Sequence, residues 1–248
     1  MTEAPRAATS DDAVARFLHD AIHSSGGRRL GRGYQATVEI YSTAAGDIVV
    51  KRPHRSALLG WLWRRLLRRE HAVYEQLAGV PGIPRTFGLI DSEYLALEYV
   101  PGPSLREHEP HLKDRPAFFA HLLETLHAMH AAGIAHADLK RKDNVIVAAG
   151  ELPFLIDFGI AARRGASRLG RAWFEHQCQA DYNAWIKLKH GRRIDSAEAA
   201  AILSPDDAAL FKPLWTERVA RTLRVPWQKI TLRRPRQRWR ARRKGGRD

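Results

Sequence analysis

The chain has 248 residues, 44% of them hydrophobic, which suffices for a sizeable core in one bilobal unit or two small domains. Its single cysteine, Cys178, excludes a disulfide within the chain and fits a reducing compartment. The N-terminal residues lack the apolar stretch of a signal peptide, and no apolar run approaches the roughly 20 residues of a transmembrane helix. We therefore expect a cytoplasmic protein.

The net charge of +14 is concentrated at the C-terminal end. Residues 218–248 contain 13 Lys or Arg and one acid, Asp248, so the basicity belongs mostly to a tail. A second basic cluster lies within residues 51–71, where Glu70 is the one acidic residue. Basic segments of this kind favour an acidic partner, such as a nucleic acid or an anionic surface.

Hydrophobic periodicity and turn residues predict a series of short elements. Ser10 can cap the first helix, and Pro116 and Gly133 bracket the strongest one. The expected elements are a helix over 10–23, a hairpin of strands within 34–42 and 46–53, a helix over about 56–77, a loop over 79–88, a strand from 94 to the Pro-Gly at 101–102, a helix over 116–132, short strands within 144–149 and 152–158, and helices over about 179–189 and 205–224.

The order of these elements predicts an α+β fold with two lobes, a small β-rich N-lobe and a shortened α-helical C-lobe, separated by a cleft. The expected parts are an N-terminal helix and linker over 1–27, the N-lobe over 28–99, the C-lobe over 100–225 and a basic tail over 226–248.

Several segments suit the binding of phosphate groups. The sequence GRGYQATV contains Gly31, Gly33 and Val38, and glycines allow backbone N–H groups to approach a phosphate closely. Ala36 stands where the usual pattern has a third glycine, and two glycines in a hairpin are also typical of a plain turn.

Lys51 ends an apolar strand, and Glu70 lies in the apolar stripe of the following helix. A buried glutamate needs a partner, so we expect an ion pair that directs Lys51 toward the α- and β-phosphates. Glu75 is the alternative partner.

The segment LEYVPG, residues 97–102, joins the two halves, and the backbone N–H and C=O groups of Glu98 and Val100 could bind an adenine edge. In LIDFG, Asp157 follows an apolar strand and precedes Gly159, a position that suits a metal bridging two phosphates. The segment LEYVPG could also be an ordinary exit from a strand, and LIDFG could be an ordinary turn.

The segment HADLKRKDNVIV, residues 136–147, supplies the remaining parts of a phosphate-transfer site. Asp138 would orient the attacking hydroxyl and accept its proton, and Lys140 would neutralise charge on the γ-phosphate. Asn144 would hold a second Mg²⁺. All these elements occur in a workable order, which argues against a set of unrelated turns.

On these motifs the chain resembles the protein-kinase-like superfamily over about residues 28–190. The resemblance implies ATP and Mg²⁺ as cofactors and transfer to a hydroxyl. The short C-lobe is similar to the minimal kinases, which include the bacterial lipopolysaccharide-core sugar kinases and the Rio-type kinases.

Three features depart from the family pattern. The family has Asn five residues after the catalytic Asp, whereas here Asp143 holds that position and Asn144 follows it, so either residue could be the second metal ligand; we favour Asn144. Ala137 replaces an arginine that binds activation-loop phosphate, so we do not expect such regulation. No Ala-Pro-Glu follows Asp157, and Asp181 resembles the Asp that supports the catalytic loop, although it also fits as a helix N-terminal acid.

The segment WLWRRLLRRE, residues 61–70, interleaves arginines with apolar residues. This pattern is typical of an interfacial helix on an anionic surface, and also of a helix whose apolar side packs in the core while its arginines face solvent. We expect an ATP-dependent kinase whose acceptor is a sugar of a membrane glycolipid, such as a lipopolysaccharide core, with peripheral association with the inner membrane as an option. The alternatives are a Rio-like protein serine/threonine kinase associated with RNA or ribosomes, and a non-catalytic nucleotide-binding scaffold.

Overall fold

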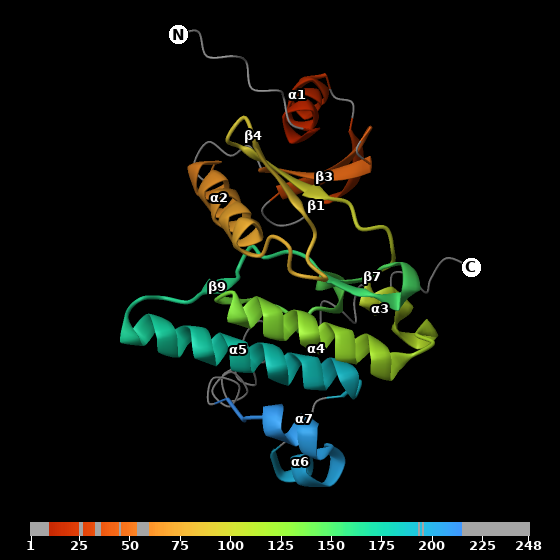
Figure 1. Cartoon of the computed structure of the whole chain (residues 1–248), viewed down its shortest axis with the longest axis vertical. Coiled ribbons are helices and arrows are strands. Elements are labelled where there is room, and N and C mark those ends of the chain that lie inside the picture. The colour runs from red at the N-terminus through yellow and green to blue at the C-terminus, as the bar shows by residue number, and fades with distance from the viewer. Residues whose placement is uncertain are drawn as a thin grey trace, which may run out of the picture. The chain divides into compact units, whose positions relative to one another are not determined.

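The computed structural model describes residues 10–24, 27–32, 36–44, 46–53, 60–192, 194 and 196–214. The chain divides into two compact units, residues 1–193 and 194–248. The first unit contains a β-rich lobe and a helical lobe (Figure 1). No helix in the described part of the chain is long and apolar enough to cross a membrane.

The β-rich lobe is built on a five-stranded antiparallel sheet in the order β1-β2-β3-β5-β4. Its elements in chain order are α1 (Ser10–His23), β1 (Arg28–Arg32), β2 (Ala36–Thr43), β3 (Gly46–Pro53), α2 (Gly60–Gln76), β4 (Thr86–Ile90) and β5 (Tyr94–Glu98). The hairpin of β2 and β3 pairs from Ala36 opposite Pro53 to Thr43 opposite Gly46. This register places Val38 opposite Lys51.

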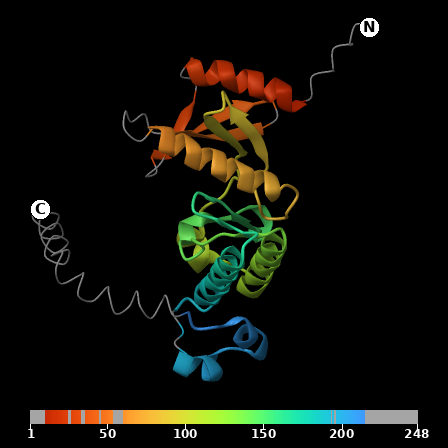
Figure 2. The same ribbon diagram turned by 90° about the vertical axis from the view of Figure 1, so that its left-hand side faces the viewer.

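Side chains alternate between the two faces of this sheet along each strand, so neighbouring residues contact different surroundings. Ile48 and Val50 of β3 point to one face, where they pack with Leu18 of α1 in a core cluster. Val49 and Lys51 point to the other face, which forms one wall of a cleft. Helix α1 therefore covers the face opposite the cleft, and the two ribbon views show α1 and α2 on different sides of the sheet (Figures 1 and 2).

The helical lobe is centred on α4 and α5, which lie side by side (Figure 1). Its elements are α3 (Leu105–His108), η1 (Glu109–His111), α4 (Arg115–Ala131), β6 (Ile134–Ala135), η2 (Lys142–Asn144), β7 (Val145–Val147), η3 (Ala149–Glu151), β8 (Pro153–Leu155), β9 (Ala162–Arg163) and α5 (Arg168–Lys189). Trp185 of α5 donates a hydrogen bond from Nε1 to the Phe119 carbonyl of α4 at 2.9 Å, and the two rings meet edge to face. The buried pair fixes the two helices against each other.

Gly102, in the connection between the lobes, has a backbone that only glycine adopts easily. Its φ is +152°, and a Cβ at this position would collide with the Val147 carbonyl. The connection can therefore approach the short strand β7 closely, and the isolated bridge between Ser104 and Ile146 continues this contact.

Three predicted boundaries were wrong. The helix expected from 179 begins at Arg168, because the Ser167 hydroxyl accepts a hydrogen bond from the Gly170 amide at 3.0 Å and caps it. The loop expected over 79–88 contains the start of β4, whose pairing with β5 is irregular near Gly88.

The helix expected over 205–224 is α7 (Pro205–Leu210), which ends before Pro213, where a proline disfavours helical backbone in the preceding residue. The second unit also contains α6 (Ser196–Ile202). Residues 215–224 of that expected helix and the basic tail over 226–248 lie outside the described residues. The strand β1 and the short helices α3 and α6 were not expected from the sequence.

Candidate functional site

A cleft of about 660 Å³ is lined by residues from both lobes. The lining includes most of the site residues predicted from the sequence, namely Val38, Lys51, Glu70, Glu98, Val100, Asp138, Asn144 and Asp157. Gly31 lies in β1 opposite Val38, and Gly33 lies outside the described residues. Residues distant in the sequence thus meet at one place.

Lys51 lies between two carboxylates on opposite sides of the cleft. Its Nζ donates to Glu70 Oε1 at 2.6 Å and to Asp157 Oδ1 at 3.3 Å. The Glu70 side chain is 3% exposed, as its position in the apolar stripe of α2 predicts, while the alternative Glu75 pairs with His71 instead. The helix, the strand and the segment after β8 are therefore joined by one cation.

These contacts keep Lys51 and Asp157 charged. Burial disfavours a charged ammonium, but the carboxylates, Glu70 above all, outweigh burial and raise the pKa of Lys51 above its ordinary value. Burial also works against charge on Asp157, but the Lys51 ammonium outweighs it and lowers the pKa of that carboxyl. A charged lysine and a charged aspartate at this spacing suit the binding of phosphate and metal.

The loop after β6 presents Asp138 to the cleft with cations close to it. Lys140 Nζ lies 3.8 Å from one carboxylate oxygen of Asp138, and Arg141 Nη1 lies 3.7 Å from the other. The Asp138 side chain is 14% exposed, whereas the two cations are largely exposed. The carboxylate therefore lies at the cleft together with Arg141, whereas Lys140 lies outside the residues that line it.

Asn144 and Asp143 both line the cleft, but their side chains have different partners, which bears on the choice between them as metal ligand. Asn144 is buried, and its Nδ2 donates to the Asp138 carbonyl at 3.2 Å. Its amide nitrogen is thus committed to the loop, and the amide oxygen is the atom that a metal would use. Asp143 instead pairs with Arg106 at 2.6 Å near the surface. This arrangement favours Asn144.

Asp181 of α5 supports the backbone of the loop that carries Asp138. Its Oδ2 accepts from the His136 amide at 2.7 Å and its Oδ1 from the Ala137 amide at 2.9 Å, while His130 Nε2 lies 3.1 Å from Oδ2. Ala137 has a φ of 65°, a strained value for a residue with a side chain. The buried carboxylate stabilises this strained backbone and so fixes the position of Asp138.

We expect Asp181→Asn to lower the free energy of unfolding by about 1–3 kcal/mol, because one buried amide donor would lose its acceptor. Urea denaturation of the variant and of the parent protein measures this difference. Glu124→Gln, on the exposed side of α4, is the control and should leave the midpoint unchanged. Equal stability of the Asp181 variant and the control would show that the hydrogen bonds of Asp181 do not contribute to the free energy of unfolding.

An aromatic column, which the sequence patterns did not reveal, connects α2 with the loop. Tyr74 meets Phe158 edge to face at 5.1 Å between ring centroids, and Phe158 meets His136 at 4.8 Å. The Tyr74 hydroxyl accepts a hydrogen bond from the Asp157 amide at 3.3 Å. The position of Tyr74, four residues after Glu70 on the same helix face, is the signal that could have identified it.

The segment between the lobes agrees only partly with the adenine-binding prediction. The Glu98 amide donates to the Arg85 carbonyl at 2.8 Å, so this N–H is not available to a ligand. Val100 lies at the wall of the cleft beside Tyr99. The predicted contact with an adenine edge would therefore use the Glu98 carbonyl and the backbone groups of Val100, because the Arg85 carbonyl next to β4 accepts the Glu98 N–H.

Comparison with known proteins agrees with this geometry. The family model for the protein kinase domain matches residues 25–182. The serine/threonine-protein kinase AfsK of Streptomyces coelicolor is 32% identical over 153 residues, which are 57% of this chain and 18% of that protein. The serine/threonine-protein kinase D of Synechocystis is 33% identical over 115 residues, 44% of this chain and 23% of that protein.

A putative cyclin-dependent kinase F-2 of Oryza sativa is 42% identical over 150 residues, 54% of this chain and 45% of that protein. The chain thus spans less than half the length of each of these relatives. The match confirms the kinase-like fold predicted from the sequence, while the two finer subtypes have no support from it. The chain belongs to the protein kinase domain family.

Proposed function

We propose that the chain is a protein serine/threonine kinase that transfers the γ-phosphoryl group of ATP to a hydroxyl. The observation that supports it most is the bond of Lys51 to both Glu70 and Asp157 in the cleft that also contains Asp138. Phosphoryl transfer needs positioning and charge neutralisation more than covalent chemistry, and these residues supply both. The presence of Lys51, Glu70, Asp138, Asn144 and Asp157 in one cleft argues against a non-catalytic scaffold.

Each residue has a distinct task in this proposal. Lys51, held by Glu70, binds the α- and β-phosphate oxygens of the nucleotide. Asp138 orients the acceptor hydroxyl and takes its proton as the oxygen attacks. Lys140 neutralises charge on the transferred group. Val38 and Val100 contribute apolar and backbone surface for the base, and Gly31 and Gly33 cover the phosphates.

The donor set fits Mg²⁺, which prefers carboxylate and amide oxygens. Asp157 and Asn144 would hold the ion, the first through its charged carboxylate and the second through its amide oxygen. When bound, Mg²⁺ neutralises the phosphate oxygens and raises the reactivity of the γ-phosphorus. Asp157 reaches its position through a left-handed backbone with a φ of 68°, a strain of the kind that functional sites retain.

Asp157→Asn should lower kcat/KM for Mg·ATP by at least about tenfold, because the metal would lose a charged ligand. The rate is measured as a function of Mg²⁺ concentration at fixed ATP. The matched control is Asp143→Asn, which should leave the Mg²⁺ dependence unchanged. Unaltered turnover for Asp157→Asn would remove this residue from the metal site, and a changed Mg²⁺ dependence for Asp143→Asn would assign the second ligand to Asp143.

The relatives named above support a protein serine or threonine as acceptor, since two of them are described as serine/threonine-protein kinases. The glycolipid sugar is the second candidate. The supporting observation is the short stretch between Gly159 and the start of α5 at Arg168, which offers little surface for docking a peptide. A Rio-like, RNA-associated kinase is a finer version of the first candidate, and salt-dependent RNA binding would support it.

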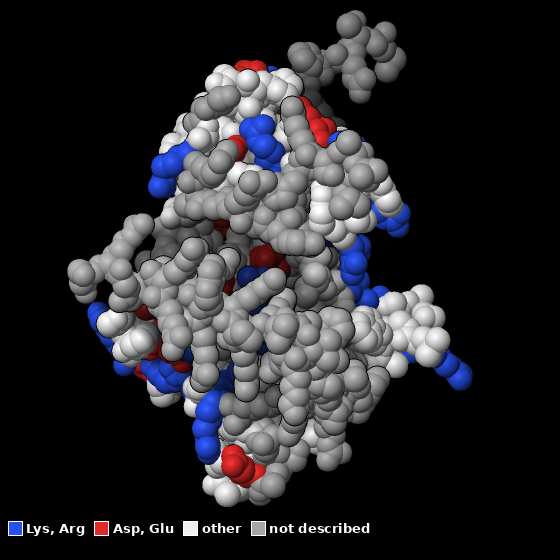
Figure 3. Space-filling view, turned by 180° about the vertical axis from the view of Figure 1, so that it is seen from behind, with Lys and Arg blue, Asp and Glu red and all other residues white. Residues whose placement is uncertain are grey.

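The basic helix α2 gives the glycolipid candidate limited support. Arg64 pairs with Glu93, Arg68 donates to the Ser92 carbonyl, and Arg69 donates to the Ala161 carbonyl. On the face shown in Figure 3, the described Lys and Arg side chains form several separate groups. Arg64, Arg68 and Arg69 thus bind residues that pack next to α2, which argues against an interfacial helix.

Phosphorylation assays separate the two acceptors. The purified protein with γ-labelled ATP would label serine and threonine in a protein fraction if the first candidate holds. Label confined to a glycolipid fraction would support the second.

A further inference from the structure

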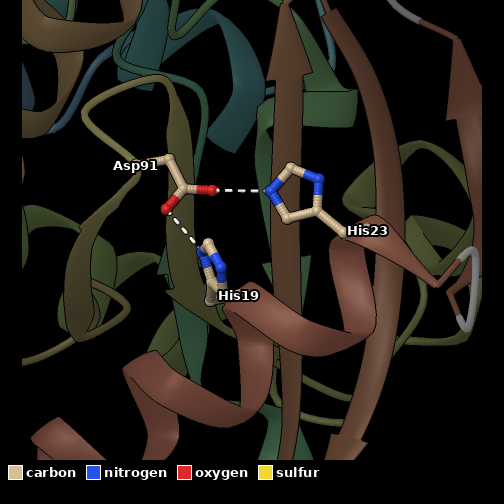
Figure 4. A group of neighbouring side chains, drawn as sticks. All are labelled: His19, His23 and Asp91. Carbon is tan, nitrogen blue, oxygen red and sulfur yellow. Dashed lines mark hydrogen bonds and ion pairs between the residues drawn. The ribbon is translucent and has the colours of Figure 1, made fainter.

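A cluster of two histidines and one aspartate lies on the β-rich lobe, away from the cleft. His19 and His23 are one turn apart on α1, and Asp91 lies in the turn between β4 and β5 (Figure 4). Their side chains point toward one another. Among the residues that the structure describes, these three form the one group of His, Cys, Asp or Glu with metal-ligand spacing.

The ligand atoms are close enough for a single ion. His19 Nδ1 lies 2.7 Å from Asp91 Oδ1, and His23 Nε2 lies 3.0 Å from Asp91 Oδ2. All three ligand atoms lie within 4.8 Å of one another. Two ligands at about 2.1 Å from a tetrahedral zinc ion are about 3.4 Å apart, so small side-chain movements complete the geometry.

We propose that His19, His23 and Asp91 bind a divalent transition-metal ion of the zinc class and thereby fasten α1 to the β4–β5 turn. Two imidazole nitrogens from positions i and i+4 of a helix and one carboxylate oxygen are a donor set that suits Zn²⁺ much better than Mg²⁺. The side chains of His19 and His23 are 54% and 57% exposed, which leaves room for water in the fourth position.

The frame around the cluster is rigid on both sides. Leu18 and Ile22 of α1 are buried against the sheet, so the helix holds the two histidines in a fixed position relative to the sheet. Asp91 and Ser92 both have left-handed backbones, with φ values of 53° and 56°. The Ser92 carbonyl also accepts a hydrogen bond from Arg68 of α2. A turn held in this way keeps the Asp91 carboxylate aimed at α1.

The cluster is separate from the site of phosphoryl transfer. Helix α1 covers the face of the sheet opposite the one that carries Lys51. An ion bound here would therefore act on the stability of the β-rich lobe, because it binds the folded chain and not the unfolded one. The ion takes the place of the hydrogen-bonded protons, which leave the ring nitrogens when the metal binds.

Titration of the tag-free, full-length chain with Zn²⁺ and with Co²⁺, in excess Mg²⁺, tests this inference. We expect one ion per chain, a visible Co²⁺ spectrum typical of nitrogen and oxygen ligands, and a rise in the thermal midpoint with Zn²⁺. The double variant H19A/H23A should weaken binding by at least about tenfold and abolish the shift in midpoint. The matched control is H111A/H121A, which replaces two exposed histidines outside the cluster and should bind as the parent does.

The variant D91N provides a second check, since it keeps the size of the side chain and removes the anionic ligand. It should weaken Zn²⁺ binding while the apo protein stays folded. Equal Zn²⁺ binding by the parent, H19A/H23A and D91N would overturn the inference. So would no binding by the parent, because the three side chains would then be joined by their hydrogen bonds alone.

Discussion

Replacement of Asp138 by asparagine should lower kcat by about 10²- to 10⁴-fold while ATP still binds, because the acceptor hydroxyl would lose its general base. Asparagine keeps the shape of the side chain and the hydrogen bonds of the loop backbone, so the fold should survive. The measurement is steady-state phosphotransfer, with nucleotide binding followed separately. A variant that lost ATP binding as well as turnover would point to a damaged cleft.

The control for this prediction lies in the same loop. Asp143 lines the cleft, but its carboxylate is partly exposed and bonded to Arg106, so Asp143→Asn should change kcat by less than about threefold. Turnover that is unchanged in Asp138→Asn would contradict the role of Asp138 as base. A large loss in Asp143→Asn alone would transfer that role to Asp143.

The second large effect concerns the buried ion pair of Lys51 and Glu70. Lys51→Met should abolish phosphotransfer and lower the free energy of unfolding by about 3–5 kcal/mol, because Glu70 would remain buried without its cation. Urea denaturation and ATP turnover measure the two effects separately. A variant that lost turnover without losing stability would show that Glu70 finds another partner or reaches water.

The double variant Lys51→Met/Glu70→Leu distinguishes the two contributions of this pair. It should recover at least half of the lost stability, since a buried ion pair can often be exchanged for apolar side chains at little cost. Phosphotransfer should stay absent, because no cation would reach the phosphates. Recovery of activity in the double variant would contradict the assignment of Lys51.

The sequence predicted the residues of the cleft better than it predicted the frame that positions them. The Lys51–Glu70 pair could be foreseen because a glutamate within an apolar helix stripe needs a cation, and one lysine ended the neighbouring strand. The role of Asp181 remained open between a brace and a helix-terminal acid. The pattern could not resolve it, because Asp181 bonds to His136 and Ala137, which lie 45 and 44 positions away in the sequence.

The features that the sequence did not predict lack a clear local pattern, each for its own reason. β4 contains Gly88 and pairs irregularly, so its strand character comes from β5 and not from alternation in its own sequence. The first half of α5 carries two arginines and exposed residues, including Trp173, and therefore lacks a clear apolar stripe. Tyr74 and Phe158 were not singled out because aromatic residues in a core are common, and only the stack with His136 distinguishes them.

In the proposed function, the cleft transfers phosphate from ATP to a protein hydroxyl. The most direct measurement incubates a bacterial lysate with the purified chain and γ-labelled ATP, then separates proteins from glycolipids, with Asp138→Asn as the blank. We expect label in the protein fraction, released as phosphoserine or phosphothreonine after acid hydrolysis. Label in the glycolipid fraction alone would replace the acceptor with a sugar, and label no greater than the blank in both fractions would contradict the claim.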